Sequence, residues 1–195
     1  MRTRSACLLA LVAAAGCAAP IQYDYSAEPD PRKGEYVIGP SDGLRILVWK
    51  YADFTTEASV RPDGIITMPL LGDIRVAGAT PSQVKKEVAQ RLSAFVKDES
   101  AVVTVSVTNP NSYRFTVSGN VEHPGIFTSR NYVSVVEAVS MAGGLNKFAA
   151  THLTILRRGS KGETRRVPIE FTRIAGGEHQ EENIVILPGD TLFVP

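Results

Sequence analysis

Short segments of alternating apolar and polar residues, separated by turns that contain Pro, Gly and Asp, make up most of this chain. Such segments predict β-strands with one buried face. Two stretches, 80–97 and 134–144, instead have the character of helices. Because each half of the chain contains one of them, the sequence predicts an α+β fold with two units, each built from strand pairs and one helix.

The first unit spans residues 36–110. Leu44, Ile46 and Val48 alternate along one segment and predict a strand with a buried face. The Pro-Asp-Gly turn at 62–64, between two apolar runs, predicts a hairpin. Thr80 suits an N-cap and Pro81 suits the first helical position, so a helix is expected to begin there. The alternating segment 101–107 completes the unit as a strand.

The second unit spans residues 111–195. Strands are predicted at 113–119 and, after a Pro124-Gly125 turn, at 125–127. Ser134 can cap a short helix that Gly143 and Gly144 end in a left-handed turn. Segments 153–158 and 164–169 are expected to form a hairpin. Two short strands around a turn at Pro188, Gly189 and Asp190 finish the chain.

The segments 38–46 and 186–194, IGPSDGLRI and ILPGDTLFV, echo each other. In each, a proline fixes the turn, and Asp42 or Asp190 can accept backbone N–H bonds where the chain enters a strand. Shared turn chemistry is sufficient to produce this likeness, so it does not establish a duplication.

The first 17 residues contain two arginines, a short apolar run from Cys7 to Ala15, Gly16 and then Cys17. This order is typical of a secretory signal. The run is about half of the ~18 apolar residues that a membrane-spanning helix needs. The segment resembles a bacterial lipoprotein signal, which implies cleavage after residue 16 and a diacylglycerol on Cys17. The alternative is an ordinary secretory signal with an incidental cysteine. By the same resemblance, Ala18 implies release to the outer membrane.

Residues 17–35 carry three prolines and mixed charge without apolar periodicity, and they predict a flexible, lipidated, extended tether. The whole chain has 21 basic and 20 acidic residues, and the signal takes Arg2 and Arg4 with it, so 19 basic residues remain. This near-neutral balance argues against nucleic-acid binding. Cys17 would be the only remaining cysteine, which excludes an intramolecular disulfide. Attachment to a membrane is expected through lipid alone.

Catalytic chemistry is not indicated by the sequence. His123, His152 and His179 are scattered without partners at metal-ligand spacing, so no metal site or cofactor is predicted. A glycosidase-like carboxylate pair is conceivable, but Asp42, Asp63 and Asp190 all lie in proline-containing turns, where backbone bonding is favoured. The protein is therefore not expected to be an enzyme.

Two blocks of motifs resemble known families. The segment from Tyr36 to Val84 is similar to the polysaccharide export (PES) domain of outer-membrane polysaccharide export lipoproteins. The segment from Tyr113 to the end is similar to the SLBB (soluble ligand-binding β-grasp) domain that follows PES in those proteins. The matching structural positions include Tyr36, Gly39, Pro40, Asp42, Leu44, Pro62, Asp63, Gly64, Gly119, Pro124, Gly125, Gly143, Gly144, Pro188, Gly189 and Asp190.

The resemblance implies a ring of identical subunits that helps carry polysaccharide across the periplasm and the outer membrane. It also implies an inner-membrane polysaccharide co-polymerase, often linked to a tyrosine kinase, as a partner. The large capsule exporters add further SLBB repeats and a pore-forming helix, whereas this sequence has one SLBB unit. It is more similar to short exporters associated with exosortase systems. A separate outer-membrane β-barrel is therefore expected to complete the route, since unpaired backbone cannot cross lipid.

Two alternatives remain open from the sequence: an adaptor that never touches polymer, and a periplasmic glycan-binding sensor. The hairpin at 157–166 offers one possible contact with polymer or a partner, through Arg157, Arg158, Lys161, Arg165 and Arg166. Its simpler interpretation is a solvated hairpin whose charges discourage edge-to-edge aggregation.

Overall fold

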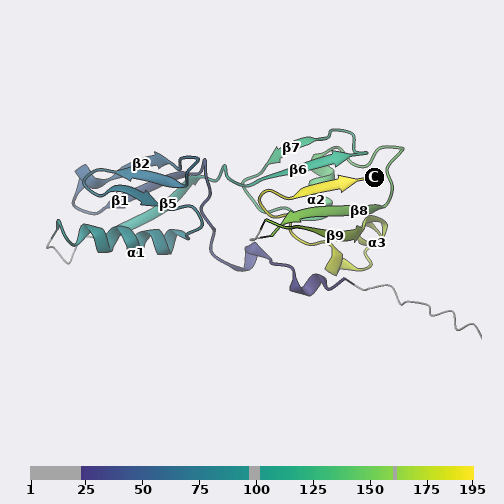
Figure 1. Ribbon diagram of the computed structural model, residues 1–195, viewed down its shortest axis with the longest axis horizontal. Coiled ribbons are helices and arrows are strands. Elements are labelled where there is room, and N and C mark those ends of the chain that lie inside the picture. Colours follow the sequence, from purple (N-terminus) through teal and green to yellow (C-terminus); the bar gives the residue numbers. More distant parts are fainter. Residues whose placement is uncertain (1–22, 97–101, 160–161) are drawn as a thin grey trace, which may run out of the picture.

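The computed structural model describes residues 23–96, 102–159 and 162–195. Buried side chains gather in two separate hydrophobic cores, one formed by residues between Ile38 and Val103 and the other by residues between Tyr113 and Val194. Figure 1 shows the corresponding two units side by side along the long axis of the molecule. The predicted α+β class with two units is confirmed, and we call them the PES unit and the SLBB unit after the families that their sequences resemble.

The PES unit contains two small sheets and one helix. Strands β1 (Gly43–Val48), β2 (Thr56–Ser59) and β5 (Val103–Asn109) form an antiparallel sheet in the order β2-β1-β5. Strands β3 (Ile65–Met68) and β4 (Gly72–Arg75) pair separately. As the alternation predicts, Leu44, Ile46 and Val48 on β1 are buried.

The unit's helix, α1 (Pro81–Leu92), begins where the sequence places it. Thr80 and Gln83 form a capping box, and Val84, Val88 and Leu92 are buried. The Pro62-Asp63-Gly64 turn also forms, with Gly64 at φ +82°. It does not make the predicted hairpin, because β2 and β3 belong to different sheets. The hairpin is instead β3–β4, closed by the turn between Met68 and Gly72.

The SLBB unit is built on a five-stranded sheet in the order β7-β6-β10-β8-β9. Its strands are β6 (Arg114–Gly119), β7 (Gly125–Thr128), β8 (His152–Arg158), β9 (Thr164–Glu170) and β10 (Thr191–Val194). The central pair β6–β10 is parallel and the other neighbours are antiparallel. Helix α2 (Val135–Met141) lies behind the sheet in Figure 1, and its buried side chains join the core.

The predicted end signals of α2 are present. Ser134 and Glu137 form a capping box, and the Gly144 N–H bonds back to the Val139 carbonyl. The second unit also holds a short helix, α3 (Phe171–Ala175), which the sequence analysis did not predict. Of the two strands expected at the end of the chain, only β10 forms. Val185 makes an isolated bridge to Ser134 instead.

Residues 23–35, which we call the strap, differ from the extended tether expected for this part of the chain. Two 3-10 turns, Tyr25–Ala27 and Pro31–Lys33, are each capped by an aspartate, Asp24 and Asp30. Tyr23 and Tyr25 pack against the SLBB core, and the Tyr25 hydroxyl donates to the Pro168 carbonyl at 2.7 Å. The strap therefore covers part of the exposed edge of β9.

Candidate functional site

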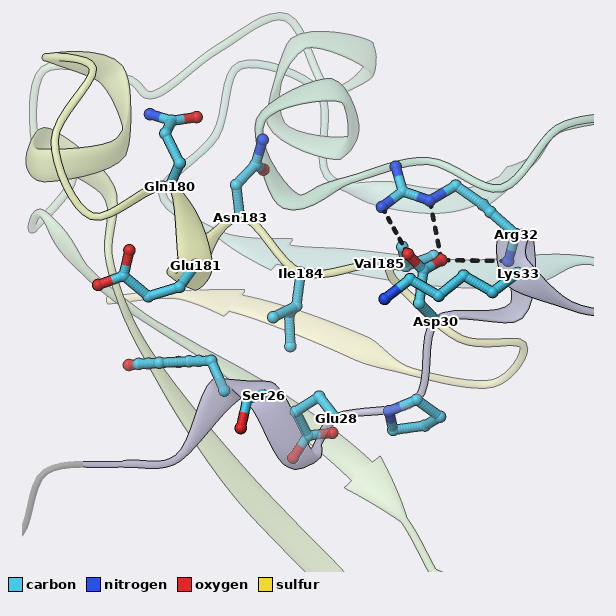
Figure 2. A pocket seen from close by; sticks show the side chains of 12 residues that line it. Ser26, Glu28, Asp30, Arg32, Lys33, Gln180, Glu181, Asn183, Ile184 and Val185 are labelled. Carbon is cyan, nitrogen blue, oxygen red and sulfur yellow. Dashed lines mark hydrogen bonds and ion pairs between the residues drawn. The ribbon is translucent and has the colours of Figure 1, made fainter.

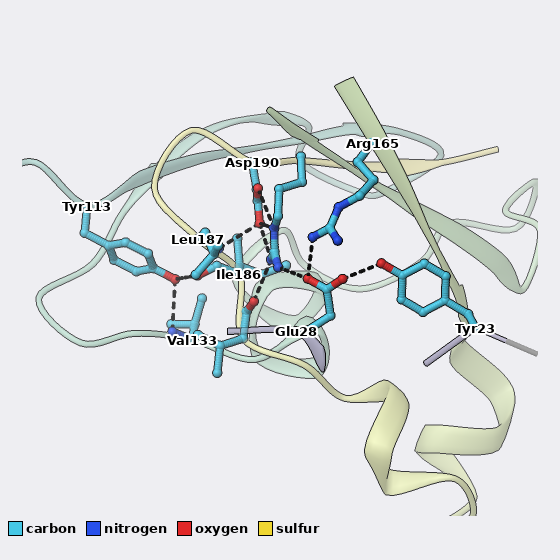
Figure 3. Close-up of polar contacts among 10 residues, drawn as sticks. Tyr23, Glu28, Tyr113, Val133, Arg165, Ile186, Leu187 and Asp190 are labelled. Carbon is cyan, nitrogen blue, oxygen red and sulfur yellow. Dashed lines mark hydrogen bonds and ion pairs between the residues drawn. The ribbon is translucent and has the colours of Figure 1, made fainter. Parts of the chain in front are cut away.

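A buried network of charged side chains joins the strap to the SLBB sheet (Figure 3). The Arg157 guanidinium, on β8, binds the Asp190 carboxylate at 2.6 Å and Glu28 of the strap at 2.5 Å. It also donates to the Val185 carbonyl at 2.9 Å. The side chains of Glu28 and Asp190 are each 2% exposed, and that of Arg157 is 5% exposed. The strap thus contributes a carboxylate to the interior of the SLBB unit.

Two further side chains complete the site around Glu28. Arg165 on β9 binds the same carboxylate at 3.0 Å from a half-exposed position. The Tyr23 hydroxyl donates to the other oxygen of Glu28. Burial, followed by this bond to Glu28, raises the pKa of Tyr23 to about 12. Two cations and two carboxylates therefore balance in one cluster, which suits a buried setting.

Asp190 and Asp42 occupy equivalent turns, as the sequence echo indicates. Asp190 accepts from the Leu187 N–H at 2.7 Å, and Asp42 accepts from the Gly39 N–H at 2.8 Å. The residue before each aspartate, Gly189 or Ser41, has a positive φ. Both carboxylates are buried and bound by donors, so neither is arranged as an acid or base for glycoside cleavage.

Asp42 also holds the boundary between the two units. It accepts from the Ser112 N–H at 2.7 Å, the Ser112 hydroxyl at 2.9 Å and the Tyr36 hydroxyl at 2.8 Å. The Tyr36 ring lies 6.3 Å from Tyr132 of the SLBB unit. A β-carbon on Gly39 would come within 2.4 Å of that of Ser112, so this position requires glycine. These motif positions serve the junction.

The remaining motif positions are structural. Gly119 has φ +91°, and a β-carbon there would meet the Val194 carbonyl oxygen at 1.9 Å. Asp63 pairs with Arg61 at 2.7 Å on the surface. Leu44 is a core residue of β1. The other positions lie in turns or at element ends: Pro40, Pro62, Gly64, Pro124, Gly125, Gly143, Gly144, Pro188 and Gly189.

A pocket of about 290 Å³ lies between the strap and residues 180–185 (Figure 2). The Asp30–Arg32 ion pair, at 2.9 Å, stands on its strap side. Gln180, Glu181 and Asn183 line the opposite side. The Asn183 side chain accepts from the Val136 N–H at 3.2 Å, which ties this wall of the pocket to α2. The pocket is thus a seam between the strap and the SLBB unit.

The structure divides the basic hairpin residues into two groups. Arg157 is a buried ion-pair partner, so the prediction of a possible surface contact is wrong for this residue. Arg165 is committed to Glu28. Arg158 and Arg166 are exposed. Lys161 and the predicted lipid site Cys17 lie outside the described residues.

No metal-ligand cluster of three or more His, Cys, Asp or Glu side chains occurs in residues 23–96, 102–159 and 162–195. His152 pairs with Glu170, and His179 pairs with Glu181. Within the same ranges, no helix is long and apolar enough to cross a membrane.

Sequence comparison agrees with this two-unit architecture. Residues 30–108 match the family described as polysaccharide biosynthesis/export protein, and residues 114–168 match the SLBB domain. The chain thus carries the export domain of polysaccharide biosynthesis/export proteins, followed by one SLBB domain.

Similar curated proteins have related names. The chain is 32% identical to the EPS I polysaccharide export outer membrane protein EpsA of Ralstonia nicotianae, over 68% of this chain and 41% of the relative. It is 30% identical to the exopolysaccharide production protein ExoF of Rhizobium meliloti, over 60% of this chain and 30% of that protein. It is 25% identical to the polysialic acid transport protein KpsD of Escherichia coli, over 65% of this chain and 23% of that protein. The chain thus spans less than half the length of each relative.

Proposed function

We propose that this protein is a lipid-anchored, periplasm-facing component of an outer-membrane polysaccharide export apparatus. The observation that carries the proposal is the export domain followed by an SLBB domain, in a chain related to named polysaccharide export outer membrane proteins. Its action is assembly and contact with polymer, and bond chemistry has no part in it. The carboxylates of Asp42 and Asp190 support this view, because they already accept hydrogen bonds from backbone N–H groups or from Arg157.

The strap supports lipid anchoring at a defined distance. Tyr23 lies six positions after Cys17, and a fully extended chain of six residues spans at most about 20 Å. Because Tyr23 is docked on the SLBB core, a lipid on Cys17 would hold that unit next to the membrane. Under this proposal, the PES unit extends away from the membrane into the periplasm.

Exposed apolar side chains support assembly into a ring of copies and contact with an inner-membrane co-polymerase. Trp49 and Val102 are neighbours at one end of the β1–β5 pair, where the Trp49 N–H donates to the Val102 carbonyl at 2.9 Å. Trp49 is 60% exposed and Val102 is 54% exposed. Large apolar side chains left open in this way are typical of protein–protein contact sites.

A strain that lacks the gene tests the proposal. Surface polysaccharide should disappear and periplasmic polymer should accumulate, and the wild-type gene should restore export. The Cys17→Ser variant should fail to restore export. The variant protein should also be lost from the membrane fraction. Unchanged polymer pools in the deletion strain would contradict a role in export and favour a glycan-binding sensor. Full rescue by Cys17→Ser would contradict the lipid anchor but leave the role in export intact.

A further inference from the structure

The SLBB sheet has two chemically different faces. Phe115, Val117, Ile155, Val167 and Leu192 alternate along their strands and point into the core with α2. Residues between them in sequence lie on the opposite face, which we call the outer face. This face carries the paired row Ile126, Thr116, Thr191, Leu156 and Arg166 across all five strands.

Three arginines gather at one end of the outer face. Register places Arg114 of β6 and Arg158 of β8 on either side of Gly189, just before β10. The Gly189 N–H donates to the Arg114 carbonyl at 2.7 Å, which confirms that the two residues are adjacent. Two strand spacings separate Arg114 from Arg158, or about 10 Å. Arg166 lies diagonally beside Arg158 on β9.

A hollow of about 510 Å³ lies on this face beside Arg158 and Gly189. Gly189 has no side chain to fill it, and a β-carbon there would meet no heavy atom within 4 Å. Arg158, Thr164 and Thr191 supply its polar lining, and Leu156 and Pro188 supply apolar surface. Arg158 lines this opening, Arg166 is its diagonal neighbour on β9, Arg114 lies across Gly189 on β6, and all three side chains are exposed.

These arginines differ from their neighbours in having no counter-charge. Among the described residues, Arg114, Arg158 and Arg166 make no ion pair, whereas Arg157 and Arg165 both bind Glu28. The carboxylate of the hairpin turn, Glu163, lies over Gly159 and pairs with none of them. At the far end of the face, the carboxylate of Glu170 contacts the His152 ring. The outer face therefore presents uncompensated positive charge at one end only.

We infer that this end of the outer face binds a carboxylate-bearing saccharide chain. Guanidinium groups bind carboxylates through paired hydrogen bonds, and an approximate 10 Å spacing lets two arginines engage different sugar units. The hydroxyls of Thr164 and Thr191 can bond sugar hydroxyls, while Leu156 and Pro188 contact the apolar faces of sugar rings. The inference rests on the proposed function and narrows its cargo to acidic polysaccharide.

Binding of defined oligomers to the purified full chain tests the inference. The probes are an oligogalacturonate, an uncharged dextran oligomer of equal length and a poly-glutamate peptide, measured calorimetrically at one fixed salt concentration. Oligogalacturonate should bind and dextran should not. Arg158→Gln/Arg166→Gln should weaken oligogalacturonate binding by about tenfold or more, from the loss of charged hydrogen bonds. Lys85→Gln/Lys86→Gln removes the same charge from the exposed side of α1 and should change affinity less than about twofold.

Each other outcome overturns the inference. Equal losses in the two double variants would show non-specific attraction to charge. Poly-glutamate binding as tightly as oligogalacturonate would assign the surface to an acidic polypeptide, and equal dextran binding would remove the role of charge. The deletion strain separates this inference from the proposed function. If the deletion strain loses export but the purified protein does not bind oligogalacturonate, only the acidic-glycan site is refuted. If the deletion strain exports normally and the protein binds oligogalacturonate, only the export role is refuted.

Discussion

At the residue scale, the adjacent residues Arg157 and Arg158 have opposite roles because a strand points successive side chains to opposite faces. Arg157 points toward the core, where Glu28 and Asp190 surround it. Arg158 points outward, where no described carboxylate meets it. A pair of identical residues therefore contributes one buried structural cation and one open binding group.

Replacing Arg157 should destabilise the SLBB unit strongly. Arg157→Met leaves the carboxylates of Glu28 and Asp190 buried without their shared cation, and breaking a buried pair in this way costs about 3–5 kcal/mol. Arg165→Gln is the matched control, because Arg165 binds the same Glu28 from a half-exposed position and should cost below about 1 kcal/mol. Denaturant unfolding of both variants measures the difference. Similar losses for the two variants would contradict the assignment.

At the element scale, the strap is held by side-chain contacts in place of strand pairing. Asp24 and Asp30 cap its two turns, and Glu28 lies between them and reaches Arg157. Burial raises the pKa of both Tyr23 and Tyr25 to about 12, assisted by the charges of Glu28 and Glu182 respectively. Docking thus favours the protonated form of each tyrosine.

The strap should therefore loosen in strong alkali. A tyrosine with a pKa raised by folding stabilises the docked state fully below its unfolded value of about 10, and that stabilisation is lost as pH rises toward about 12. An NMR titration of the Tyr ring carbons should find Tyr23 and Tyr25 titrating near pH 12. In Glu28→Gln, the Tyr23 midpoint should fall, because the bond to the Glu28 carboxylate and its charge no longer add to the effect of burial.

Tyr113 supplies the internal control for that titration. Burial in the SLBB core raises its pKa to about 12, and its hydroxyl is bonded to Val133 and Ile186 away from the strap. Its midpoint should be the same in wild type and Glu28→Gln. Wild-type Tyr23 and Tyr25 titrating near pH 10 would show that the strap is not docked in solution.

Local chemistry made much of this fold predictable. The caps at Thr80 and Ser134, the glycine end of α2 and the aspartate turns depend on residues within a few positions of each other, so the sequence displays them directly. The Glu28–Arg157 pair joins residues 129 positions apart, and no local pattern marks it. The proline-rich composition of the strap indicated the absence of regular elements, but it carried no information on docking.

The predicted 62–64 hairpin was wrong for a related reason. Turn chemistry at Pro62, Asp63 and Gly64 sets a reversal of the chain, yet it does not decide which strands pair after it. The strand before this turn, β2, pairs with β1, whose residues Leu44, Ile46 and Val48 are buried, whereas the strand after it, β3, pairs with β4. The alternation of residues along β6 would have placed Arg114 on the outer face from sequence alone. Its closeness to Arg158 depends on the strand order β6-β10-β8, which the sequence does not display.

At the scale of the whole molecule, two separate cores are joined by a small junction. Asp42 binds Ser112, and Tyr36 approaches Tyr132, between units whose buried clusters share no residue. Small cores of this kind can unfold as separate cooperative units. The junction therefore sets how the two units sit without merging their stability.

Substitution at the junction should affect the two cores unequally. Asp42→Ala leaves the N–H groups of Gly39 and Ser112 without their acceptor, and each such buried group costs about 1–3 kcal/mol. Amide hydrogen exchange should accelerate in β1 and β5, which follow and face the Asp42 turn, and remain slow in β6 and β10. Equal acceleration in both sheets would instead show one cooperative unit.

The docking of the strap on the SLBB sheet also decides where mechanical load would enter the protein. A pull on the N-terminus reaches Tyr23 and Glu28 before it reaches Tyr36, so tension passes into β8 through the Arg157 ion pair. With the N-terminus held at a membrane, drag on the outer face would be balanced within the SLBB unit itself. The PES unit, beyond the strap, would then be spared that tension and left free to make contacts of its own.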